Sequence, residues 1–201
     1  MSPYGTRRTD EGFTLLETII ALGIVGTVMA SLAVFFLRSA TLQHRQADMQ
    51  VAAQIASSSM DYVSELPGEN VLLGRTQAAV QAAWQAPGIS TYLDPTRTEL
   101  AWQDPSLPPS ASVQGLPTTP ETIQMTNDAT PYQRWWYVGL CWQAKTGGDC
   151  VVVLSSLRNQ YIQMYRIVVA ITWPSPDCTS NQCQYLATML TESTLDDPTW
   201  E

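Results

Sequence analysis

The feature that most constrains this chain is a run of twenty uncharged residues between Glu17 and Arg38. A helix rises about 1.5 Å per residue, so this run is long enough to cross the roughly 30 Å hydrocarbon core of a bilayer. A secretory signal peptide would have a shorter apolar core that ends at a small-residue cleavage site. The sequence therefore predicts a retained transmembrane segment over residues 18–37.

Glu17 lies in the first turns of this predicted helix. An ionised carboxylate that faces lipid costs about 3 kcal/mol, and a group with that cost usually has a partner. A glutamate at the membrane edge can also reach the lipid headgroups and have no further role. The residues around Glu17 must decide between these two interpretations.

The segment GFTLLE at residues 12–17, with two arginines before it and the apolar run behind it, resembles the class III signal of type IV prepilins and type II secretion pseudopilins. In that family a prepilin peptidase cuts after the glycine and methylates the new N-terminus. The resemblance implies removal of a leader formed by residues 1–12, cleavage between Gly12 and Phe13, and N-methylation of Phe13. It places the leader in the cytoplasm and the precursor in the bacterial inner membrane.

The same resemblance implies an assembly role for Glu17, because the matching glutamate pairs with the N-terminal amine of a neighbouring subunit. Cleavage creates an ammonium group at Phe13, and methylation keeps it charged. A buried ammonium and a buried carboxylate satisfy each other only when the two subunits have the right axial register. Glu17 is therefore expected to fix the axial register between neighbouring subunits.

The predicted helix continues past the membrane segment and spans residues 13–66. Beyond Arg38 one mostly apolar stripe recurs at three- and four-residue steps, with polar residues on the other faces. The stripe comprises Ala52, Ile55, Ala56, Ser59, Met60, Val63 and Leu66. Pro67 and Gly68 then end the helix, because proline cannot continue it and glycine suits the cap. This second half of the helix is expected to lie against a globular domain.

The remaining residues, 67–201, are predicted to form that extracytoplasmic globular domain, of ordinary domain size. Residues 67–133 are expected to hold a short helix and proline-rich loops. Residues 134–192 are expected to form an antiparallel sheet, and residues 193–201 a tail. The predicted fold class is α+β, a long helix packed on a small antiparallel sheet, which is also the type IV pilin architecture.

Within this domain, a short helix is predicted over residues 77–85, which end at a Pro-Gly pair. Residues 87–131 hold eight of the thirteen prolines of the chain and show little periodicity. We expect them to form a mostly irregular surface connection, with one short strand near residues 122–125.

Four strands are predicted after this connection, because aromatic and β-branched residues are concentrated there. Residues 134–142 and 150–154 flank a turn at residues 145–148, which predicts a β-hairpin. A third strand is predicted over residues 165–173, where Pro174 halts it. A fourth strand is predicted over residues 184–191.

The four cysteines of the chain all occur late in the sequence. Cys141 and Cys150 bracket the predicted hairpin turn, and Cys178 and Cys183 close a tight loop between the third and fourth strands. Of the three connectivities, the two local disulfides are favoured, although the sequence does not settle the pairing. The alternative is a four-thiolate zinc site, but only the second pair has a usual ligand spacing. Disulfides predict a domain outside the cytoplasm.

The sequence offers little for catalysis, and we expect no enzyme and no cofactor. The only histidine, His44, follows the membrane segment on the long helix, where a Ser-His-Asp or Cys-His arrangement has poor geometry. Loop oxygens are candidate calcium ligands, as in some pseudopilins, but they lack a fixed spacing and are more often solvated. These candidates are Asp177, Asn181, Asp196 and Asp197.

Nucleic acid is an unfavoured partner, because the chain has a net charge of −8 and contains no basic run. Arg134, Trp135 and Trp136 do combine a cation with stacking surfaces. Successive residues of a strand face opposite sides, however, so at least one of the two tryptophans is expected in the core.

Together these features predict a minor type IV pilin that assembles into a pilus filament, or primes or caps it. The expected partners are other pilin subunits, the prepilin peptidase and the inner-membrane assembly platform, and the expected final location is the cell-surface pilus. A pseudopilin of a type II secretion or competence system shares every N-terminal residue and is the first alternative. An adhesin or binding module anchored by the pilin helix is the second, and it would require an exposed aromatic or polar pocket.

Overall fold

The computed structural model describes residues 14–85, 92–104, 115–125 and 130–193 of the chain. The chain divides into two compact units, Met1–Asp48 and Met49–Glu201. The boundary falls within a long helix, α1 (Leu15–Ser64), whose last residues, 49–64, belong to the second unit. We call the second unit the head.

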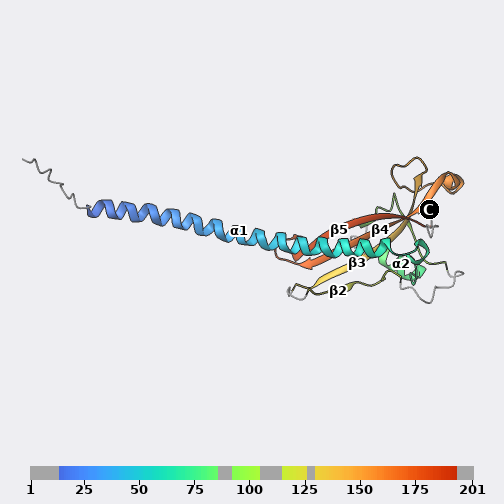
Figure 1. Cartoon of the computed structure of the whole chain (residues 1–201), viewed down its shortest axis with the longest axis horizontal. Helices are drawn as coiled ribbons and strands as arrows, with labels where there is room; N and C mark the ends of the chain where they lie inside the picture. Colours follow the sequence, from blue (N-terminus) through green and yellow to red (C-terminus); the bar gives the residue numbers. More distant parts are fainter. Residues whose placement is uncertain (1–13, 86–91, 105–114, 126–129, 194–201) are drawn as a thin grey trace, which may run out of the picture. The chain divides into compact units, whose positions relative to one another are not determined.

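Helix α1 buries one stripe within the head, as the sequence periodicity predicts. The residues at the other predicted helix faces, such as Gln54 and Asp61, are exposed. Figure 1 shows this part of α1 lying along the strands of the head. The buried residues of α1 are Ala52, Ile55, Ala56, Ser59 and Val63. The stripe therefore forms one wall of the core.

The head contains one antiparallel sheet with the strand order β1-β3-β4-β5, and β2 also pairs with β3. Its strands are β1 (Glu99–Leu100), β2 (Glu121–Ile123), β3 (Tyr132–Ala144), β4 (Tyr161–Pro174) and β5 (Gln182–Glu192). The short helix α2 (Gln77–Trp84) matches its predicted range, and the side chain of Thr76 caps it by accepting a hydrogen bond from the amide of Ala79. A long helix packed with a five-stranded sheet confirms the predicted α+β, type IV pilin-like fold.

The two faces of the sheet differ in what covers them. On the helix face, Trp136, Val138, Ile167, Val169 and Ile171 join the α1 stripe in one apolar cluster. Removal of each large aliphatic side chain from water contributes roughly 1.5–3 kcal/mol, so this cluster is the main source of the stability of the head.

The outer face carries the alternate residues of the same strands, including Tyr137 and Gly139 on β3 and Arg166 and Val168 on β4. Val168 is buried here as well, as are Val80 of α2 and Leu93 of the loop that precedes β1. A side chain at position 139 would collide with the Thr98 methyl group, so glycine allows the 92–98 segment to lie against β3.

The predicted hairpin is wrong in its second strand. Strand β3 pairs along its length with β4, and of residues 150–154 only Val151 bridges to β3, opposite Trp142. The reason is the apolar surface that each pairing removes from water. Residues 167–173 of β4 are all buried, whereas Leu154 is 74% exposed.

The proline-rich connection is less irregular than predicted. Its described residues contain β2, close to the predicted short strand, and also β1, which the sequence did not indicate. Strand β1 pairs with Leu140 and Gly139, and β2 pairs with residues 132–134. These two short strands and Val151 pair with successive parts of one edge of β3. The proline-rich connection therefore joins the sheet through short strands, and it needs no long strand.

Both disulfides join neighbouring cysteines in the sequence, Cys141 with Cys150 and Cys178 with Cys183, which is the connectivity that the sequence favours. The described chain has no free cysteine, so no thiolate is left to bind zinc. Each bond adds roughly 2–3 kcal/mol by restricting the unfolded chain. The first bond anchors the 148–150 segment to β3, and the second closes the turn between β4 and β5.

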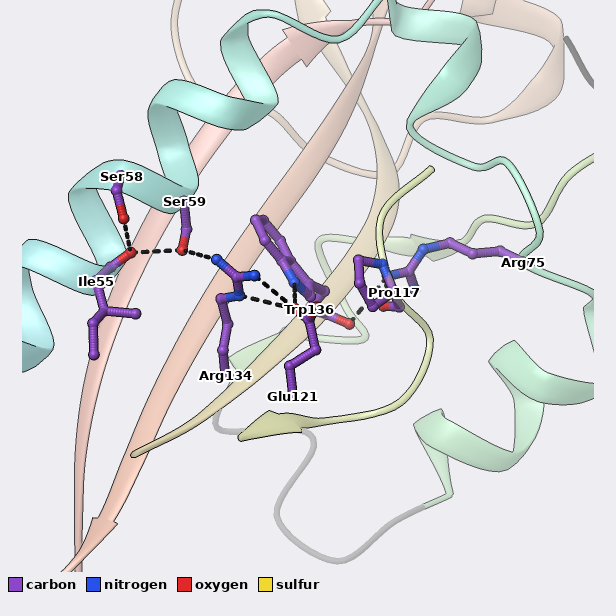
Figure 2. A network of polar contacts seen from close by, with 8 residues as sticks. All are labelled: Ile55, Ser58, Ser59, Arg75, Pro117, Glu121, Arg134 and Trp136. Carbon is purple, nitrogen blue, oxygen red and sulfur yellow. Dashed lines mark hydrogen bonds and ion pairs between the residues drawn. The ribbon is translucent and has the colours of Figure 1, made fainter. Parts of the chain in front are cut away.

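A polar network crosses the interface between α1 and the sheet (Figure 2). The Arg134 guanidinium donates from Nη1 to Ser59 Oγ at 3.0 Å, and from Nε and Nη2 to Glu121 Oε2 at 3.0 and 2.8 Å. The indole of Trp136 donates to the same carboxylate oxygen at 3.2 Å. Ser59 itself donates to the Ile55 carbonyl oxygen at 2.6 Å. The one polar residue in the buried stripe is thus fully hydrogen-bonded.

We predict that Arg134→Met lowers the free energy of unfolding by about 1–3 kcal/mol, because Glu121 then loses its cationic partner at a half-buried site. Urea denaturation of the full chain in detergent measures this change. The control is Arg97→Met, which removes the ion pair of Arg97 with Asp149, whose side chains are 43% and 81% exposed. That pair should contribute at most about 1 kcal/mol. Equal losses in the two variants would contradict the prediction.

Candidate processing and assembly site

Helix α1 begins at Leu15, two residues beyond Phe13. The backbone amide of Glu17 donates to Thr14 Oγ1 at 3.3 Å, and the hydroxyl of Thr18 donates to the Thr14 carbonyl oxygen at 3.1 Å. Thr14 thus acts as the cap that satisfies one of the free amides at the helix start. Gly12 and Phe13 lie outside the described residues.

Glu17 is the acidic residue in the first turn of α1, and its side chain is exposed. A carboxylate at this end of a helix is favoured by the helix dipole. It is also the only charged residue between Thr14 and Arg38. The structure therefore places one negative charge at the start of a long uncharged helical segment.

The first part of α1 has the length and composition to cross a membrane, and within the described residues no other helix does. None of its most apolar stretch is buried by the chain itself. Its hydroxyl groups bond to the helix backbone: Thr27 Oγ1 donates to the Ile24 carbonyl oxygen at 2.8 Å and Ser31 Oγ to that of Thr27 at 2.9 Å. The segment therefore presents few unsatisfied polar groups to an apolar environment.

A family model described as the prokaryotic N-terminal methylation motif matches residues 7–33 of the chain. No curated protein and no solved structure matches the chain significantly. The match supports a type IV pilin-like precursor. For such a precursor it implies processing by a prepilin peptidase and assembly with other pilins, and it suggests a structural rather than an enzymatic subunit. The apolar helix and the motif together support a membrane-anchored precursor.

The other candidate site residues are placed as follows. His44 is exposed on α1. Asp177 directly precedes the loop that Cys178 and Cys183 close, and Asn181 lies within that loop, whereas Asp196 and Asp197 lie outside the described residues. Among the residues that the structure describes, no three histidine, cysteine, aspartate or glutamate side chains gather as a group able to hold a metal ion.

Of Arg134, Trp135 and Trp136, which were considered for nucleic-acid stacking, Arg134 and Trp136 lie on the helix face of the sheet. Trp136 is 5% exposed and Arg134 bonds to Ser59 and Glu121, both on the helix face. Trp135, on the outer face, is half-buried. This confirms that one tryptophan of the pair belongs to the core.

Sequence reasoning missed a cavity of about 430 Å³ on the outer face of the sheet. The 92–98 and 148–150 segments form one side, and β4 and β5 contribute Arg166, Thr188 and Leu190. The only sequence signal was Arg166, a charged residue inside an otherwise uncharged strand. The cavity depends on segments about fifty residues apart, which no local pattern relates.

Tyr92, at this cavity, stacks on Tyr137 of β3 with ring centroids 4.7 Å apart. Burial raises the pKa of Tyr137 to about 12, and the neighbouring Tyr92 adds to the shift. A raised pKa means that the fold favours the neutral phenol. This contribution to stability is complete below about pH 10 and is lost as the pH rises through 12.

We therefore predict that Tyr137→Phe makes the free energy of unfolding less sensitive to alkaline pH. The variant and the parent chain should lose different amounts of stability between pH 9 and about pH 11.5, with the larger loss in the parent. Denaturant unfolding at a series of pH values measures the two slopes. Parallel slopes for the two proteins would contradict the prediction.

Proposed function

We propose that this chain is a minor type IV pilin, a structural subunit that assembles into a pilus filament, or primes or caps it, after removal of residues 1–12. The observation that carries the proposal is the division of α1. A methylation motif at residues 7–33 includes the start of an apolar segment that the chain leaves uncovered, and the same helix then packs into a disulfide-bonded head.

This division suits extraction from a membrane into a filament. An apolar helix that leaves lipid needs another apolar environment, and bundled helices of neighbouring subunits supply one. The head, which is stabilised by its own core and two disulfides, suits the oxidising exterior. The proposed partners are other pilins, the prepilin peptidase and the inner-membrane assembly platform, and the proposed final location is the pilus at the cell surface.

Glu17 is proposed to set the register of this assembly. Phe13, which would carry the new amine, is four residues before Glu17 in the sequence, so the amine of one subunit would reach the carboxylate of another after a defined axial shift. Each charge is costly alone in an apolar environment, and the two are compensated as a pair.

The first prediction concerns processing. Coexpression of the full chain with a prepilin peptidase should give a product that begins at N-methylated Phe13, and expression without the peptidase should give the uncleaved chain. Gly12→Val should block cleavage, because it adds a branched side chain at the predicted cut. Gly23→Ala is the matched control, since a Cβ there meets nothing within 4 Å. Intact mass and N-terminal sequencing report the outcome, and an uncleaved chain in both strains would overturn the proposal.

The second prediction concerns assembly. Glu17→Gln, which keeps the side-chain shape and removes the charge, should still be cleaved and inserted but should lose incorporation into filaments by about tenfold or more. Glu65→Gln, a like change at an exposed position just beyond α1, should assemble normally. The incorporation of each variant is measured as the amount of subunit in filaments sheared from the cells, relative to the amount that remains in the membrane fraction. The proteins that co-purify distinguish a pilus from a secretion or competence system.

A further inference from the structure

The outer-face cavity has the dimensions of a ligand site. Its volume of about 430 Å³ falls within the range of roughly 300–1,000 Å³ that is typical of small-molecule pockets. Its lining combines the aromatic ring of Tyr92, the apolar Val168 and Leu190, the hydroxyl of Thr188 and the guanidinium of Arg166. The lining also includes Arg97 and the carboxylates of Asp94 and Asp149, so polar and charged groups make up much of it.

The walls of this cavity are held in place by several independent bonds. Arg166 donates from Nη1 to Thr98 Oγ1 at 3.1 Å and from Nη2 to the Cys150 carbonyl oxygen at 2.7 Å. Cys150 is itself bonded to Cys141, and Arg97 forms an ion pair with Asp149. The two segments beside the cavity are thus tied both to the sheet and to each other.

Arg166 differs in its charge balance from three of the other arginines of the head, whereas the buried Arg75 resembles it in bonding only to uncharged oxygens. Arg97, Arg134 and Arg158 each form an ion pair with a carboxylate. Within the described chain, Arg166 bonds only to a hydroxyl and a carbonyl oxygen, and it forms no ion pair. Arg166 is half-buried, and this desolvation lowers its pKa, whereas the nearby carboxylates of Asp94 and Asp149 act in the opposite direction. The guanidinium has five N–H donors, and these two hydrogen bonds use only some of them.

The groups around Arg166 restrict the anion that fits. A carboxylate matches the guanidinium fork with two parallel hydrogen bonds. Asp94 and Asp149 at the same cavity, and the net charge of −8 on the chain, disfavour polyanions such as nucleic acid. Aspartates also accept hydrogen bonds from ligand hydroxyls. A single carboxylate on a hydroxylated ring therefore suits this lining better than a phosphate.

We propose that the outer-face cavity binds an acidic sugar, whose carboxylate is held by Arg166 and whose ring lies between Tyr92 and Leu190. The inference goes beyond the role in a filament and is independent of processing, because the cavity lies wholly within the head. It gives the pilin-like subunit a recognition function for carboxylated glycans.

The competing interpretation is that Arg166 serves only to tie the two loop segments to β4. Two variants separate the interpretations. Arg166→Gln removes the charge and weakens the tie. Leu190→Trp fills the cavity from a position that is 38% exposed, and it leaves both hydrogen bonds of Arg166 in place. Arg38→Gln, on the exposed surface of α1, is the control for loss of one arginine.

The test is a titration of the full-length chain in nanodiscs with D-glucuronate, followed by ligand-observed NMR, with D-glucose as the neutral counterpart. We expect saturable glucuronate binding with a Kd of about 1 mM or tighter, and glucose binding at least about tenfold weaker. Arg166→Gln and Leu190→Trp should each weaken glucuronate binding by about tenfold or more, and Arg38→Gln should leave it unchanged.

Circular dichroism and the thermal midpoint establish that each variant is folded. If Arg166→Gln unfolds, Leu190→Trp alone decides the question. Three results would overturn the proposal: no saturable binding of glucuronate, equal binding of glucose, or undiminished glucuronate binding in a folded Leu190→Trp variant.

Discussion

The structure depends on an apolar helical surface that the chain cannot cover by itself. Large side chains of α1 such as Ile20, Met29 and Phe36 are more than half exposed, although burial of each would contribute roughly 1.5–3 kcal/mol. Such a surface persists only in lipid or against the helices of other chains. Lipid covers this surface in the membrane-anchored precursor, and the helices of other subunits would cover it in the proposed filament.

The same helix satisfies different requirements along its length. In its first part, hydroxyl groups such as those of Thr27 and Ser31 bond back to helix carbonyls, which suits an apolar solvent. Within the head, Ser59 bonds both to its own helix and to Arg134 on the sheet. The first arrangement leaves the helix free to change partners, whereas the second fixes α1 to one strand.

The outer face of the head shows how a small domain positions loops without extending its core. The disulfide of Cys141, the two hydrogen bonds of Arg166 and the close approach at Gly139 hold separate segments against the sheet. Cross-links restrict the unfolded chain, and they do not require further apolar area. The cavity exists because these segments are held at the rim of the face and leave the surface above β4 and β5 open.

Patterns that depend only on nearby residues were predicted well from the sequence. The helix, its buried stripe, α2 and the strands later seen as β4 and β5 follow from periodicity and from turn residues. The hairpin prediction failed because a strand-like segment at residues 150–154 was assumed to pair with its nearest neighbour. Strand β1 was missed because two residues carry no periodicity, and their strand character comes entirely from β3.

The sequence by itself determined the membrane segment, the methylation motif, the α+β class and the face of α1 that enters the core, because each arises from local order along the chain. Only the tertiary structure decided which strand lies beside β3, why Ser59 is buried, and that Arg166 faces a cavity without an ion-pair partner. These outcomes depend on which distant segments remove the most apolar surface from water and satisfy each other's polar groups, and that competition is settled only when the whole head folds.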